Sequence, residues 1–152
     1  MGVEVNVAVI IDRTPAIVWS QVEDIATHVE WMQDAVAIDF DTDQRQGEGT
    51  SFVCATRVGP IRIQDHMEIT EWVEGRRMGV RHTGLVTGLG AFTLEALTEG
   101  RTEFRWEEEL VLPWFLGGGL GQPLGARVLE RIWKANLAAL KDRIEARTAP
   151  AT

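Results

Sequence analysis

The sequence predicts an α+β protein in which one long helix, near the carboxy-terminal end, covers an antiparallel β-sheet. Two observations indicate this fold class: strand-like runs follow one another at short intervals through the middle of the chain, and an amphipathic tail follows them. Runs without helices between them form an antiparallel meander, because parallel strands need long crossover connections. A sheet of this size needs cover on one face, and only the tail is long enough to provide it.

The amino-terminal part predicts one strand and two short helices. Residues 3–11 alternate, with valine at every second position at first, which indicates a half-buried strand. Thr14 followed by Pro15 is typical of a helix N-cap and the first helical position. Asp24 or Thr27 then caps a second short helix.

The middle of the chain predicts about six further strands. The period-two alternation returns at residues 35–40, and after a polar stretch the strand-like runs cover residues 50–58, 61–73, 77–83, 91–98 and 102–112. Turn residues separate these runs, since glycine admits positive φ and proline fixes φ. The predicted junctions are Gly59-Pro60, Glu74-Gly75, the stretch 84–90 and Glu99-Gly100.

The tail predicts one long amphipathic helix over residues 123–146. Leu124, Val128 and Ile132 begin a stripe of apolar residues at helical spacing, and Pro123 suits a first-turn position. At ~1.5 Å per residue this helix would be about 36 Å long. We expect a single domain over residues 1–147 and a frayed tail over residues 148–152.

Composition excludes several functional classes. A net charge of -8 and a pI near 4.9 make nucleic acid or an anionic membrane surface an unsuitable partner. One cysteine excludes an internal disulfide and a cysteine-based zinc cluster, and the three histidines are scattered, so we expect neither metal nor cofactor. No uncharged apolar run approaches the ~18 residues of a spanning helix, and the amino terminus lacks a signal-peptide pattern. We therefore expect a soluble cytoplasmic protein without integral membrane association; whether it forms a homo-oligomer stays open.

Landmarks along the chain carry a resemblance to a known superfamily. They are Thr14-Pro15-Ala16 and Val18-Trp19, then Asp24, His28 and Trp31-Met32, then GEGT at residues 47–50 and Gly59-Pro60, and finally Leu112-Pro113 before a glycine loop and an amphipathic helix. In this order they resemble the START/Bet v 1-like superfamily, also called SRPBCC, and within it the polyketide cyclase/dehydrase and lipid-transport branch. The resemblance covers nearly the whole chain. It implies a helix-grip fold, in which a curved antiparallel sheet of about seven strands wraps around the long helix, often with a ligand cavity between them.

Three ionisable residues lie in phase with the predicted core. Asp65, His82 and Glu108 each share a strand face with apolar neighbours. A buried unpaired charge is costly, so each of them needs a partner, a water molecule or a shifted pKa. In a curved sheet His82 could pair with Asp65 or Glu108, and the set could orient a polar ligand or transfer protons. A β-bulge would instead turn such a side chain to solvent.

Further candidates for ligand contacts are mostly aromatic. Besides the three ionisable residues, the predicted ligand-binding set contains Met67, Phe92, Phe104, Trp106, Trp114, Trp133 and Asn136. The tryptophans either line a pocket or fill the core, and Asn136 either faces the sheet or lies at the edge of the helix stripe. Trp114 and Phe115 precede a run of glycines, which indicates a cavity mouth or gate.

Other features of the sequence point less clearly to chemistry. Residues 119–125 have GxGxxxG spacing, but no strand follows the helix and Pro123 occupies its first turn, so we expect no dinucleotide site. Cys54 is interpreted as a small buried residue without a positioned base. His28 lies either on the helix surface or at a cavity rim.

Three functional hypotheses follow. The first is a protein that binds a small hydrophobic or aromatic ligand, lipid- or polyketide-like, in a cavity between sheet and helix. The second is a polyketide cyclase, aromatase or dehydratase, for which His82, Asp65 and Glu108 are the candidate catalytic residues. The third is a regulatory or assembly protein whose interior is filled by side chains.

Overall fold

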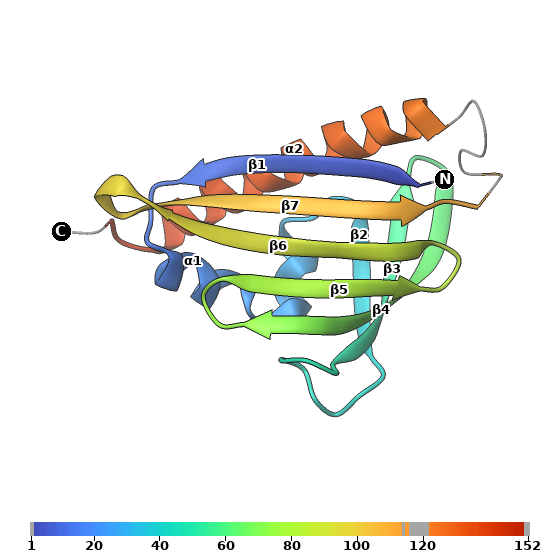
Figure 1. Cartoon of the computed structure of the whole chain (residues 1–152), viewed down its shortest axis with the longest axis horizontal. Coiled ribbons are helices and arrows are strands. Elements are labelled where there is room, and N and C mark those ends of the chain that lie inside the picture. The colour runs from blue at the N-terminus through green and yellow to red at the C-terminus, as the bar shows by residue number, and fades with distance from the viewer. Residues whose placement is uncertain (1, 114, 116–121, 151–152) are drawn as a thin grey trace.

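The computed structural model describes residues 2–113, 115 and 122–150 (Figure 1). Its elements in chain order are β1 (Val3–Ile11), α1 (Pro15–Val22), the 3-10 helix η1 (Ile25–Glu30), β2 (Ala35–Phe40), β3 (Ser51–Val58), β4 (Ile61–Val73), β5 (Arg77–Thr83), β6 (Thr87–Leu97), the 3-10 turn η2 (Thr98–Gly100), β7 (Arg101–Val111) and α2 (Gln122–Arg147). This is the predicted order of strands and helices. In the described ranges no helix is long and apolar enough to cross a membrane.

The strands form one seven-stranded antiparallel sheet. Their order is β1-β7-β6-β5-β4-β3-β2, so each strand lies beside its neighbour in the chain except β1, which pairs with β7. The sheet is strongly curved: in Figure 1 strands β4 to β7 run across the view, whereas β2 and β3 turn away from them. Helix α2 runs behind the sheet and contacts β1. The predicted α+β helix-grip fold is confirmed.

Local signals in the sequence position the two short helices. Pro15 starts α1, where its missing N–H needs no partner, and Thr14 has the extended backbone of an N-cap. Asp24 caps η1, since its Oδ1 accepts a hydrogen bond from the Ala26 N–H at 3.2 Å. The second predicted helix is therefore present and is a 3-10 helix.

The core lies between the concave face of the sheet and α2. Trp133, Leu137, Leu140 and Ile144 form a buried stripe along one face of α2, at the spacing that a helix requires. They belong to one apolar cluster with sheet residues such as Phe104, which is fully buried. Full burial of a large apolar side chain contributes about 1.5–3 kcal/mol, so this stripe is what holds the helix on the sheet.

Glycines at the start of β6 are the main departure from the predicted boundaries. The sequence predicts a junction over residues 84–90, but β6 begins at Thr87, so Gly88 and Gly90 lie inside the strand. Gly88 has a φ of 141°, a conformation that residues with a Cβ rarely adopt. Gly90 lies against the side chain of Glu108. These two glycines make room within the sheet and do not turn the chain.

The carboxy-terminal end of α2 and Thr148, which follows it, are tied to the loop after β1. Arg13 is buried, and its Nε donates a hydrogen bond to Thr148 Oγ1 at 2.9 Å. Its Nη2 donates to the carbonyl oxygens of Thr148 at 3.0 Å and Glu145 at 2.7 Å. Thr148, the first residue of the expected tail, therefore has defined contacts.

Candidate functional site

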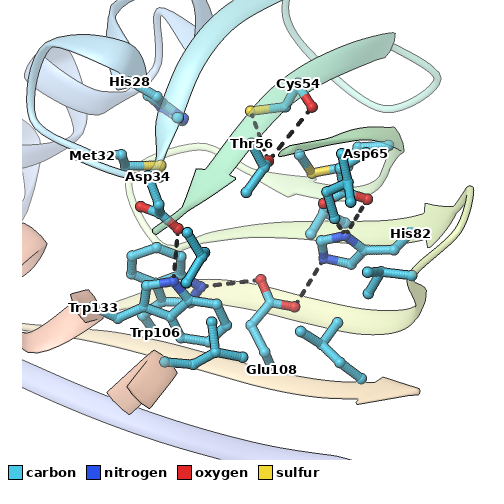
Figure 2. Close-up of a pocket in the computed structure, with 18 of the residues that line it drawn as sticks. His28, Met32, Asp34, Cys54, Thr56, Asp65, His82, Trp106, Glu108 and Trp133 are labelled. Carbon is cyan, nitrogen blue, oxygen red and sulfur yellow. Dashed lines mark hydrogen bonds and ion pairs between the residues drawn. The ribbon is translucent and has the colours of Figure 1, made fainter. Parts of the chain in front are cut away.

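A cavity of about 470 Å³ lies between the concave face of the sheet and α2. Most of its wall is apolar, because the inward faces of the strands supply side chains such as Ile63, Met67 and Val80. The polar and ionisable side chains that share the wall are His28, Asp34, Cys54, Thr56, Asp65, His82 and Glu108 (Figure 2).

The cavity opens near the first turns of α2. Four of its lining side chains are also exposed: Ile61 at the start of β4, Phe115 after β7, and Leu124 and Val128 in α2. These residues place a mouth between the β3–β4 turn and the beginning of the helix. The sequence predicts a cavity mouth or gate at Trp114 and Phe115, and Phe115 is one of these exposed lining residues.

His82 lies between two carboxylates, as Figure 2 shows. Its Nδ1 is 2.9 Å from Asp65 Oδ2, and its Nε2 is 3.0 Å from Glu108 Oε2. Pairing of His82 with Met67 places Asp65 diagonally across on β4, while Glu108 reaches across β6 from β7. All three side chains are buried. We call them the charged trio.

Both ring nitrogens of His82 donate hydrogen bonds, so the side chain is an imidazolium. A carboxylate oxygen only accepts, and each nitrogen that faces one must carry a proton. Burial disfavours the positive charge, but the hydrogen bonds and charges of Asp65 and Glu108 outweigh it and raise the pKa of His82 to about 10. His82 therefore keeps its proton at neutral pH and has no nitrogen free to act as a base.

Glu108 reaches His82 because β6 has a glycine at the opposite position. Gly90 pairs with Glu108, and a Cβ at residue 90 would overlap the Glu108 carboxylate. The other carboxylate oxygen, Oε1, accepts the indole N–H of Trp106 at 3.0 Å. Two donors therefore fix the orientation of this carboxylate in the cavity wall.

A third carboxylate, Asp34, lies in the turn before β2 and is not among the predicted site residues. Its Oδ2 accepts the indole N–H of Trp133 at 3.2 Å, and its Oδ1 accepts Asn136 Nδ2 at 2.7 Å. The spacing of Trp133 and Asn136 puts both on the face of α2 that meets this turn. Asn136 Oδ1 in turn accepts the Gln33 N–H at 3.0 Å.

The two sets of polar contacts meet at a pair of stacked tryptophans. Trp106 of β7 and Trp133 of α2 lie nearly parallel, with ring centroids 4.4 Å apart and an interplanar angle of 13°. Trp106 holds Glu108 and Trp133 holds Asp34, so the pair connects the charged trio to the Asp34 carboxylate. Sheet and helix thus share one hydrogen-bonded and stacked wall.

The other two ionisable side chains in the wall are neutral. Burial lowers the pKa of His28 to about 4, although its hydrogen bond to the Val22 carbonyl acts in the opposite direction. Its Nε2 lies 2.7 Å from that carbonyl oxygen and must carry the proton, which leaves Nδ1 as an acceptor. Burial, together with the charges of Asp65 and Asp34, raises the pKa of Cys54 to about 11, so its thiol is not an activated nucleophile.

Most of the predicted ligand contacts lie in the cavity wall. The structure places there Asp65, Met67, His82, Phe92, Trp106, Glu108 and Trp133. Phe104 and Asn136 lie outside the lining: Phe104 is buried in the core, and Asn136 holds Asp34. Trp114 and residues 119–121 of the GxGxxxG stretch lie outside the described residues.

Solved structures with the same fold come from several bacteria. A protein from Thermus thermophilus superposes with a TM-score of 0.77 at 20% identity, over 96% of this chain and 99% of that chain. A START superfamily protein from Mycobacterium smegmatis superposes with a TM-score of 0.79 at 12% identity, over 97% of this chain and 100% of that chain. The Zhui aromatase/cyclase from Streptomyces sp. R1128 superposes with a TM-score of 0.75 at 16% identity, over 97% of this chain and 96% of that chain. At such identities the likeness concerns the fold.

Family membership follows from the sequence itself. A search of curated proteins finds no significant match. The model of the family described as polyketide cyclase / dehydrase and lipid transport, however, matches residues 2–145. The chain therefore belongs to the polyketide cyclase / dehydrase and lipid transport family.

Proposed function

We propose that the protein binds a small hydrophobic or aromatic ligand, lipid- or polyketide-like, in the cavity between the sheet and α2. The observation that carries this proposal is the cavity itself, with about 470 Å³ behind a largely apolar wall. Small-molecule sites typically measure ~300–1,000 Å³ and combine an apolar wall with a few placed polar groups. Its volume and lining both fit that description.

Fixed polar groups support binding in one orientation. The charged trio and Asp34 are held by hydrogen bonds within the protein, so they need little reorganisation when a ligand arrives. The mouth beside Ile61 and Leu124 provides an apolar route from solvent. Apolar surface on the ligand would supply most of the affinity, and the carboxylates would align its polar end.

An enzyme of the cyclase, aromatase or dehydratase type is the second candidate. The observation that favours it is a buried cluster of acidic and basic groups in the cavity wall, since such reactions need proton transfer. Because His82 holds its proton at neutral pH, Asp65 or Glu108 would have to accept the proton. Turnover of a polyketide mimic that is unchanged in both Asp65→Asn and Glu108→Gln would remove this candidate.

A regulatory or assembly protein with a filled interior fits the structure less well. That hypothesis predicts tryptophans that fill the space between sheet and helix. Trp106 and Trp133 instead stack on each other at one wall of the cavity. This arrangement favours a ligand as the occupant of the interior.

Binding of a neutral apolar dye tests the proposed function. N-phenyl-1-naphthylamine brightens in an apolar environment, and we expect saturable enhancement with the wild-type protein. Ile63→Trp would fill the cavity from β4, whereas Gln64→Trp adds the same bulk to the outer face of the same strand. We expect affinity to fall about tenfold or more in the first variant and to stay unchanged in the second.

Two outcomes would contradict the proposal. The first is no saturable enhancement with the wild-type protein. The second is equal dye affinity in Ile63→Trp and Gln64→Trp, because the dye would then bind elsewhere. Circular dichroism of both variants checks that they are folded.

A further inference from the structure

Hydrogen-bond donors in the cavity wall are already used within the protein. Both nitrogens of His82 donate to carboxylates, and the indole N–H groups of the stacked tryptophans donate to Glu108 and Asp34. A carboxylate oxygen can accept more than one hydrogen bond. Asp34, Asp65 and Glu108 therefore keep acceptor capacity that a ligand can use.

The remaining polar groups add little donor capacity. The Nδ1 of His28 is unprotonated and cannot donate, because the Nε2–H of the same ring is bound to a backbone carbonyl. The Thr56 hydroxyl lies 3.5 Å from the Cys54 carbonyl oxygen and is a neutral group. A ligand in this cavity thus meets a wall of acceptors.

The charges in the wall are unbalanced. The carboxylates of Asp34, Asp65 and Glu108 carry three negative charges against the one positive charge of His82, which leaves a net charge of -2. No lysine or arginine is among the described residues that line the cavity. A carboxylate ligand would add a further buried negative charge and would find no charged donor free to bind it, which is unfavourable.

Aromatic rings lie in the same wall as the carboxylates. Phe92, Trp106 and Trp133 all line the cavity. Rings and carboxylates together form an environment that suits a positively charged group attached to an apolar skeleton.

We propose that the cavity selects a hydrophobic ligand that carries a protonated amine, with the acceptors of Asp34, Asp65 and Glu108 holding the ammonium group. This inference rests on the proposed function, since it requires that the cavity binds a ligand. The inference adds to the proposed function the charge of the ligand's polar end. Among ligands with the same apolar skeleton, the cavity should bind the ammonium form most tightly, the neutral alcohol less tightly and the carboxylate least tightly.

Three ligands with one skeleton test the order. We would use 1-naphthylmethylamine, 1-naphthalenemethanol and 1-naphthoate at pH 7 to displace the neutral dye from the wild-type protein. The amine is expected to bind about tenfold or more tightly than the carboxylate, because two net negative charges favour the cation. The alcohol serves as the uncharged reference.

A matched pair of variants locates the origin of the preference. Asp34→Asn removes one carboxylate from the wall, and Asp39→Asn removes one from the exposed face of β2. The ratio of amine to alcohol affinity is expected to fall about threefold or more in the first and to stay constant in the second. Because each ratio is measured within one variant, a general loss of affinity does not distort it.

The outcomes separate this inference from the proposed function. Carboxylate binding as tight as amine binding would overturn the inference while the dye still binds. Dye binding without displacement by the amine would also overturn it and leave the cavity as a ligand site. An unchanged ratio in Asp34→Asn would contradict the role of that carboxylate. Failure of the wild-type protein to bind the dye or any of the three ligands would overturn both proposals.

Discussion

Gly90 of β6 lies opposite Glu108 of β7, and the Glu108 carboxylate occupies the space that a side chain at residue 90 would need. This relationship lets an acidic side chain on β7 reach the imidazole of His82 on β5, across the strand between them. The charged trio thus depends on the absence of one Cβ atom.

Gly90→Ala should displace Glu108 and lower the pKa of His82. The added methyl group overlaps the carboxylate, which must then give up its hydrogen bonds to His82 and Trp106. NMR titration of the histidine Cε1–H signals should show the His82 pKa lowered by about one unit or more, since one of two raising partners is lost. In a Glu108→Ala background the same glycine substitution should change little, and an equal effect in both backgrounds would contradict this explanation.

The stability of the protein should fall as pH rises from about 6.5 to about 10. His82 has a pKa raised from 6.5 to about 10 in the folded state, so its contribution is complete below the lower value and is lost as pH passes the higher one. The loss attributable to His82 should be roughly 3–5 kcal/mol of unfolding free energy. Urea unfolding of wild type and His82→Gln across this range measures it. An identical pH dependence in both proteins would contradict the assignment.

Acid should destabilise the protein through His28. Its pKa is lowered from 6.5 to about 4, so the folded state resists protonation, and stability is lost as pH falls between these values. At pH 5 the wild-type protein should have lost about 2 kcal/mol through this group relative to pH 7. His28→Gln should remove that part of the dependence. The exposed His66 is the matched control, and a His66→Gln variant with the same effect would refute the assignment.

Trp133→Phe should destabilise the protein by about 1–3 kcal/mol, because it removes the N–H that binds Asp34 while keeping most of the ring. Trp72 pairs edge to face with Trp19, and its N–H has no hydrogen-bond partner among the described residues, so Trp72→Phe is the control. Urea unfolding at pH 7 compares the two variants. A stability loss in Trp133→Phe no larger than that in Trp72→Phe would contradict a stabilising hydrogen bond between Trp133 and Asp34.

Alternation in the strands is sufficient to predict that the charged trio points inward. Residues two apart in a strand share a face, and Asp65, His82 and Glu108 each follow apolar residues at that spacing. That His82 contacts both carboxylates could not be predicted, because it depends on strand register. The register shift between Ile69 and Glu71 shows that alternation alone does not determine which residues face each other.

Asp34 and Gly90 show where the sequence is least informative. The contacts of Asp34 come from residues 99 and 102 positions away, and nothing in its own turn indicates them. Gly90 lies in a glycine-rich stretch that is typical of a turn. Only the position of Glu108 on the neighbouring strand explains why a glycine is needed inside β6.

The most direct test of the account is to observe the indole N–H signals of the six tryptophans while a ligand binds. The ¹⁵N-labelled protein is titrated with 1-naphthalenemethanol, which is the neutral ligand. Trp106 and Trp133 line the cavity, so their signals should shift. Single Trp→Phe variants assign the signals. Trp19 and Trp72 pack against each other outside the lining, so their signals should stay in place. Saturable shifts of Trp106 and Trp133, with the signals of Trp19 and Trp72 unchanged, are the predicted result. No shift of these two signals at saturation, or shifts of Trp19 and Trp72 alone, would contradict a ligand site between sheet and helix.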